Sequence, residues 1–202
     1  MVQGPVHDRG RGERAADIRV VPDSWDAGVL DQGLQPGEVA VGLLQTENYA
    51  RAAVEAARPS LSPDDVDKAV AIRMTRQEIF ERDRPPRVWF IIDESALMRV
   101  AASPATMRGQ CEHLLSIGQR PEITIQVIEN GQGICCAFGR AFVILSFDHQ
   151  GDLVYFEEVG TAKYLRKRED VDRYTLAFDH LRASALPDSK SAELIRRIAQ
   201  DG

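Results

Sequence analysis

The 202-residue chain has few cysteines and few aromatic residues. Its three cysteines, Cys111, Cys135 and Cys136, are too few and wrongly spaced for a disulfide framework. No CxxC pair and no tetrahedral zinc spacing occurs, and the four histidines form neither an HxxxH nor an HExxH pattern. The sequence therefore excludes a disulfide-stabilised scaffold, and we expect no metal and no cofactor.

Long apolar runs are also lacking. No stretch of the chain comes close to about 18 consecutive apolar residues, the length that a membrane-spanning helix needs. The first twenty residues lack the apolar core of a secretory signal. Together with the cysteine usage, this predicts a protein of the reducing cytoplasm with no membrane partner.

The charge of the chain argues against nucleic acid. The net charge is −6, whereas a nucleic-acid binder usually presents a basic surface. One segment is basic, through Lys163, Arg166, Lys167, Arg168 and Arg173. A solvated helix start explains this segment without any nucleic acid, so we expect no DNA binding by this chain alone.

The length predicts one domain with a core of its own. Residues 1 to about 16 are rich in glycine and arginine and predict a mobile tail. Residues 17–38 carry scattered proline and glycine and predict an irregular entry segment rather than a regular element. We therefore divide the chain into residues 1–37 and a single domain at 38–202.

The sequence predicts several helix starts. Ser62-Pro63 and Ser103-Pro104 each place serine at the N-cap and proline at the first helical position. The first of these helices should run to about Arg82, and the second ends at Gly118. Thr46 is the expected N-cap of an alanine-rich helix before them, and apolar stripes at helical spacing continue to the C-terminus.

The strands predict the fold class. Apolar runs at 88–92 and 123–128 indicate buried strands, and the helical crossover between them favours a parallel pair. Segments 141–147 and 153–157 predict an antiparallel hairpin on the same sheet, and 135–138 can add a short strand. The expected fold is mixed α/β, with a small sheet of about four strands flanked by several helices.

One helix carries polar residues where a core is expected. At 100° per residue, Arg73, Arg76 and Gln77 fall on the same face as Val66 and Phe80. A buried guanidinium group needs a paired acid or a bound anion, because its desolvation is otherwise costly. Two interpretations follow: an internal salt-bridge network that fixes this helix on the sheet, or a pocket for a polar ligand at the carboxyl end of the strands.

The acids that could serve either interpretation are Asp93 and Glu94, between a strand and a helix, and then Glu157 and Glu158 at the end of the hairpin. Asp93 and Glu94 could form a general acid–base pair, although helix capping explains Asp93 more simply. The Cys135-Cys136 pair is typical of a buried strand, because no adjacent base or helix start is evident to activate a nucleophile. His113 borders the apolar face of its helix and is interpreted as packed or surface histidine.

Short motifs in a fixed order add a family resemblance. They are VGLLQTENYARA at 41–52, RMTRQE at 73–78, DESAL at 93–97, QCEHL at 110–114, IQVI at 125–128 and YFE at 155–157. Together they resemble the C-terminal domain of actinobacterial XRE-type helix-turn-helix regulators, often called antitoxin-like. The resemblance runs from about residue 38 to the end of the chain.

The resemblance implies a role in transcriptional regulation through a sensed signal or a bound partner. In that family a helix-turn-helix module precedes the domain and a small partner protein often accompanies it. This sequence departs from the pattern twice: residues 1–38 show no helix-turn-helix periodicity, and Val41 stands where the family has proline. We therefore expect a stand-alone regulatory domain.

Two functions from different classes remain. The first is a regulatory module that binds a small protein of a toxin–antitoxin-like system or a small polar ligand, and it can form a homodimer. The second is a small-molecule enzyme of secondary metabolism with acid–base chemistry, in which Asp93, Glu94 or Glu157 carries the proton. The ligand-binding candidates for both are Gln45, Tyr49, Arg73, Arg76 and Gln77.

Overall fold

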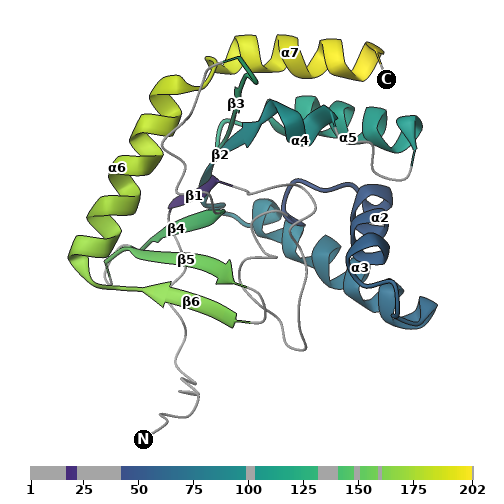
Figure 1. Ribbon diagram of the computed structural model, residues 1–202, viewed down its shortest axis with the longest axis horizontal. Coiled ribbons are helices and arrows are strands. Elements are labelled where there is room, and N and C mark those ends of the chain that lie inside the picture. Colours follow the sequence, from purple (N-terminus) through teal and green to yellow (C-terminus); the bar gives the residue numbers. More distant parts are fainter. Residues whose placement is uncertain are drawn as a thin grey trace, which may run out of the picture.

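The computed structural model describes residues 17–21, 42–98, 103–131, 141–147, 151–158 and 161–201. Its helices are α2 Glu47–Ala57, α3 Pro63–Gln77, the 3₁₀ turn η1 Glu78–Glu81, α4 Glu94–Met98, α5 Pro104–Ile117, α6 Arg168–Ser184 and α7 Asp188–Asp201. Its strands are β1 Asp17–Val21, β2 Arg87–Asp93, β3 Ile123–Ile128, β4 Phe142–Ser146, β5 Leu153–Glu158 and β6 Thr161–Leu165. The predicted mixed α/β class is confirmed (Figure 1).

The expected helix caps are present. The Ser62 hydroxyl accepts from the Asp65 N–H at 3.3 Å, and the Ser103 hydroxyl accepts from the Thr106 N–H at 3.1 Å. Thr46 caps α2 in the same way. The helix predicted from residue 63 to about Arg82 ends earlier as an α-helix and continues as η1.

The six strands of the described residues form one sheet in the order β3-β2-β1-β4-β5-β6. The predicted parallel pairing of β2 with β3 is confirmed, with Phe90 opposite Ile125. The predicted hairpin of β4 and β5 is also confirmed and is antiparallel. Gly151 enters β5 with φ +73°, a left-handed conformation that glycine adopts without strain.

The described sheet has two strands, β1 and β6, beyond the about four that the sequence predicts. β1 lies within the segment predicted to be irregular, and it pairs in parallel with β2 and antiparallel with β4. It therefore joins the parallel and antiparallel halves of the sheet. β6 overlaps the start of the basic segment for which the sequence predicts a helix start, and the helix begins only at Arg168. The tail at 1–16 and the strand at 135–138 lie outside the described residues.

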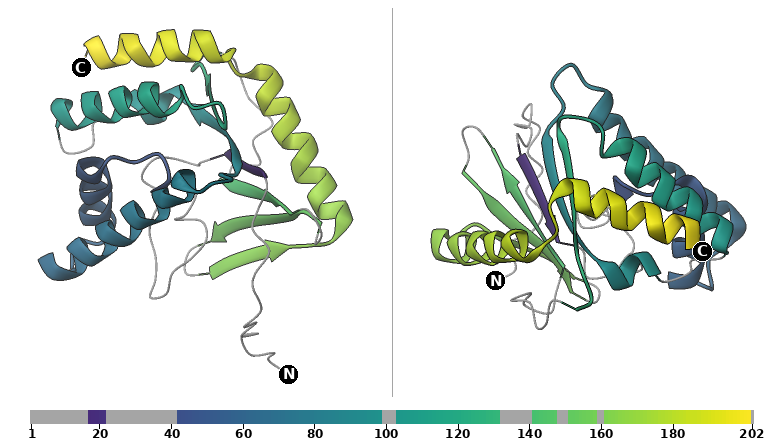
Figure 2. Two further views of the ribbon diagram at one scale, coloured as in Figure 1. Left: turned by 180° about the vertical axis from the view of Figure 1, so that it is seen from behind. Right: turned by 90° about the horizontal axis from the view of Figure 1, so that it is seen from above.

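Helices cover both faces of the sheet (Figure 2). One face is covered by α6, whose Phe178 packs into a core with Ile144 and Val154. The opposite face packs against α2, α4, α5 and α7 in a larger core that includes Tyr49, Phe90 and Leu114. Among the described residues, no helix is both long and apolar enough to cross a membrane.

Candidate functional site

The polar residues of α3 reach the segment that precedes α2. Arg73 is 5% exposed, and its Nη1 donates to the Gln45 side-chain oxygen at 3.0 Å. One turn later, the Gln77 amide donates to the carbonyl oxygens of Gly42 at 2.9 Å and Gln45 at 2.6 Å. The helical period thus brings together Gln45, Arg73 and Gln77, three of the five predicted ligand-binding residues.

A residue of α5 completes this network. Gln110 is fully buried, and its amide donates to the Leu44 carbonyl while its side-chain oxygen accepts from the Thr46 N–H at 2.8 Å. Sequence reasoning missed Gln110, although it is a polar residue beside Cys111 on the apolar face of its helix. We call Gln45, Arg73, Gln77 and Gln110 the polar brace, because they attach residues 42–46 to two helices.

The other two predicted ligand-binding residues differ in burial. Tyr49 belongs to α2 and is fully buried in the larger core. Arg76 lies on α3 and is half-buried.

The predicted acids make contacts away from the polar brace. The Asp93 carboxylate accepts from the Ser95 N–H at 2.8 Å, which is the capping role expected for it. The Glu94 carboxylate accepts from the Asn130 N–H at 2.9 Å and so joins α4 to the end of β3. Glu157 lies on β5, but its side chain is outside the described residues. The hypothesis of an acid–base pair gains no support from Asp93 and Glu94.

Two further groups of nucleophile or ligand type lie on α5, the buried Cys111 and the half-buried His113. Burial raises the pKa of the Cys111 thiol to about 11, which keeps it protonated and unreactive at neutral pH. Burial also lowers the pKa of His113. In the described part of the chain, no group of three His, Cys, Asp or Glu side chains could hold a metal ion. Cys135 and Cys136 lie outside that part.

A cavity of about 460 Å³ opens at the amino ends of β1, β2 and β3, and its lining includes Arg19, Arg87, Trp89, Glu122 and Thr124. This is the end of the parallel strands opposite to the one where a pocket was expected. Arg19 is fixed there by the Ser146 hydroxyl at 3.0 Å and the Asp152 carboxylate at 3.1 Å.

Trp89 lines this cavity and is held by neighbouring side chains. Its indole N–H donates to the Gln126 side-chain oxygen at 2.8 Å, and the Gln126 amide donates to the Leu186 carbonyl at 2.9 Å. The Arg182 guanidinium lies over the indole, 5.1 Å from the ring centroid. The cavity therefore has an aromatic wall that α6 and the α6–α7 junction hold in place.

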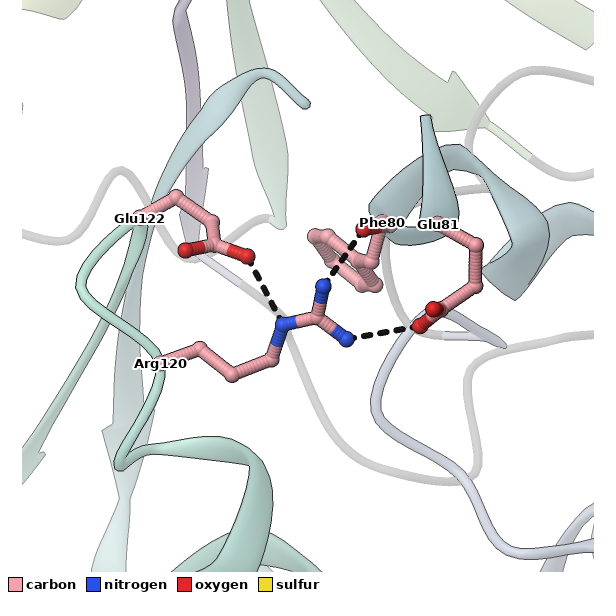
Figure 3. A network of polar contacts seen from close by, with 4 residues as sticks. All are labelled: Phe80, Glu81, Arg120 and Glu122. Atoms are coloured by element: carbon pink, nitrogen blue, oxygen red, sulfur yellow. Dashed lines mark hydrogen bonds and ion pairs between the residues drawn. The ribbon is translucent and has the colours of Figure 1, made fainter. Parts of the chain in front are cut away.

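Arg120 forms a second network beside this cavity (Figure 3). Its guanidinium contacts the Glu81 and Glu122 carboxylates, each at 2.7 Å, and donates to the Phe80 carbonyl oxygen. These contacts join η1 to the start of β3. The hydrogen bond from Arg120 holds the pKa of Glu122 below its usual value.

Replacing Arg120 with alanine is expected to lower the free energy of unfolding by about 1.5 kcal/mol at pH 7, since three polar contacts are lost at a partly exposed site. A carboxyl with a depressed folded pKa stabilises above its unfolded pKa of about 4.3 and loses this effect as pH falls through the folded value. Urea unfolding should therefore show a difference between the two proteins that shrinks below about pH 4. The exposed Arg84→Ala is the control, and a difference that stays constant down to pH 2 would contradict the role of Glu122.

Neither a curated protein nor a solved structure matches the chain. One family matches residues 36–197, under the description "Domain of unknown function (DUF5753)". The matched range includes the polar brace, the Arg120 network and every described strand except β1. Because this match spans well over half of its residues, the chain belongs to the DUF5753 family.

Proposed function

We infer that this chain is a regulatory interaction domain that acts by binding a protein partner in the cytoplasm. The sequence motifs that resemble actinobacterial XRE-type, antitoxin-like regulators support this role. The DUF5753 match covers the same part of the chain as those motifs. In this proposal the partner is the small protein of a toxin–antitoxin-like system.

The polar brace supports an interaction domain over an enzyme. Gln77 and Gln110 direct their amides to backbone groups of residues 42–46, and Arg73 donates to Gln45 within the same segment. Buried polar groups satisfied in this way rigidify a fold. Asp93 and Glu94 have structural contacts of their own. The alternative, an acid–base enzyme of secondary metabolism, therefore stays a prediction. Among the described side chains, neither Asp93 nor Glu94 is positioned as a proton carrier.

The observation that carries the proposal is the difference between the two edges of the sheet. At β3, the α6–α7 junction covers the edge, because the Leu186 N–H donates to the Val127 carbonyl at 2.9 Å and Ser191 accepts from the Val127 N–H at 3.0 Å. At the other end of the sheet, β6 pairs with β5 alone among the described strands. An edge strand with no partner on its outer side among the described strands is a template for another chain.

The test is purification of the tagged protein from its source cells, followed by native mass spectrometry. We expect a complex of fixed stoichiometry with one small protein. A chain that is isolated without any protein partner would contradict the proposal.

If the mass instead showed one bound small molecule, ligand sensing would replace partner binding. The cavity with Arg19, Arg87 and Trp89 in its lining favours that second function, because Trp89 gives it an aromatic wall.

A further inference from the structure

The outer edge of β6 offers backbone groups for a further strand. In an antiparallel pair, alternate residues direct their N–H and C=O groups toward the partner and the others direct them away. β6 has β5 on one side, with Tyr164 opposite Tyr155 and Lys163 opposite Phe156. In the part of the chain that the structure describes, no strand pairs with the other side.

The two faces of this edge differ in chemistry. On one face, Tyr164 is 48% exposed, with its ring centroid 5.2 Å from that of Tyr155. On the other face, the Lys163 ammonium lies 5.9 Å from the centroid of the Phe156 ring. An added strand would therefore meet an aromatic surface on one side and a positive charge on the other.

Charge complementarity points to the sign of the partner. Arg166 and Lys167 follow β6 directly and are exposed, so three cationic side chains lie within five residues in a chain of net charge −6. Opposite charges across a strand pair stabilise it, and like charges directly opposite each other destabilise it. This local charge favours an acidic strand.

The same rule disfavours a second copy of this chain. Lys163 is the central residue of β6. A two-fold antiparallel pairing of β6 with itself would place the Lys163 side chains of the two copies opposite each other.

We propose that β6 binds an extended acidic segment of the partner protein as a seventh strand of the sheet, a refinement that rests on the proposed function. Backbone hydrogen bonds provide the attachment, and alternate side chains provide the specificity. In the partner segment, an apolar residue faces Tyr164 and a carboxylate faces Lys163. Further carboxylates face Arg166 and Lys167.

The first experiment uses a fluorescent peptide of alternating glutamate and valine residues, long enough to span β6, and measures anisotropy with the full chain. We expect saturable binding that weakens as salt is raised. N-methylation of alternate backbone amides should weaken binding at least about tenfold, because it removes the ladder hydrogen bonds. A peptide of lysine and valine should not bind. Equal binding of the N-methylated peptide would overturn the proposal.

Substitutions in the protein locate the contact. Lys163→Glu and Tyr164→Ala should each weaken peptide binding at least about tenfold, whereas Lys68→Glu, a charge reversal at an exposed position of α3, should have no effect. Both β6 side chains are exposed, and urea unfolding of each variant checks that the fold is retained. Because the N-methylated peptide requires no variant, the proposal stays testable even if one of them fails to fold.

The partner complex separates this proposal from the proposed function. If Lys163→Glu and Tyr164→Ala abolish the complex while Lys68→Glu retains it, the proposal stands. A complex that persists with both β6 variants would overturn strand addition and leave the regulatory function intact. If no complex forms with any version of the chain, the proposed function fails. A dimer of the chain that is lost in Lys163→Glu would also overturn the proposal, because β6 would then bind a second copy.

Discussion

A chain that begins at Pro36, where the family match begins, is expected not to form the six-stranded sheet. It lacks β1, which pairs with both β2 and β4 and joins the two halves of the sheet. It also lacks Ile18, a buried residue of the larger core. Without β1, the loss in the free energy of unfolding should exceed the whole stability of a typical domain, which is about 5–15 kcal/mol.

Circular dichroism during urea titration checks this expectation. The shortened chain should show no cooperative transition, whereas a control that begins at Gly12 retains β1 and should unfold cooperatively. A synthetic peptide that spans β1, added to the shortened chain, should restore part of the transition. If the chain from Pro36 unfolded with the same free energy as the full chain, β1 would not be a working part of the sheet.

The second large effect is expected at the polar brace. Arg73→Ala should lower the free energy of unfolding by about 3 kcal/mol, because it removes a buried side chain and leaves the Gln45 side-chain oxygen without this donor. Arg73→Met keeps much of the aliphatic stem, so its loss should be smaller. The matched control is Lys68→Ala, an exposed residue of the same helix, which should change stability by less than about 0.5 kcal/mol.

Urea unfolding distinguishes the two interpretations of Arg73. A large loss of stability identifies it as a structural residue that holds segment 42–46 on the helices. A gain in stability in Arg73→Ala would be the opposite result, because residues retained for ligand binding often cost stability. That outcome would identify the polar brace as a ligand site.

Much of the fold could be predicted because local signals and global structure agree. Ser62-Pro63 and Ser103-Pro104 start helices through contacts within three residues, so the sequence alone contains the whole cause. The apolar runs of β2 and β3 are buried because helices cover both faces of the sheet there. Their helical crossover then determines that they are parallel.

The strands that were missed are short and locally ambiguous. β1 is the five-residue run DIRVV in a segment with proline and glycine, and its β-branched residues were the available signal. β6, with the sequence TAKYL, carries a lysine and leads into further basic residues, so charge concealed its alternation. The partners of β1 are strands distant in sequence, which local patterns do not contain, whereas β6 pairs with the adjacent β5.

The polar brace was predictable in part for a similar reason. Helical spacing identified Arg73 and Gln77 as polar residues on an apolar face. Their partners are the Gln45 side chain and backbone carbonyls of residues 42–46, rather than Asp93 and Glu94. An irregular segment that folds back onto a helix leaves no periodic pattern in the sequence, so the acids of the next strand end were the natural candidates.

The position of β1 in the sheet also has a consequence for synthesis on the ribosome. β1 is made first, but its antiparallel neighbour β4 follows about 120 residues later. At roughly 5–20 residues per second, the nascent chain carries this strand unpaired on that side for roughly 6–24 s. During this interval β1 can pair wrongly or be bound by a chaperone. Translation speed between β1 and β4 should therefore influence the yield of native protein, even where the amino-acid sequence is unchanged.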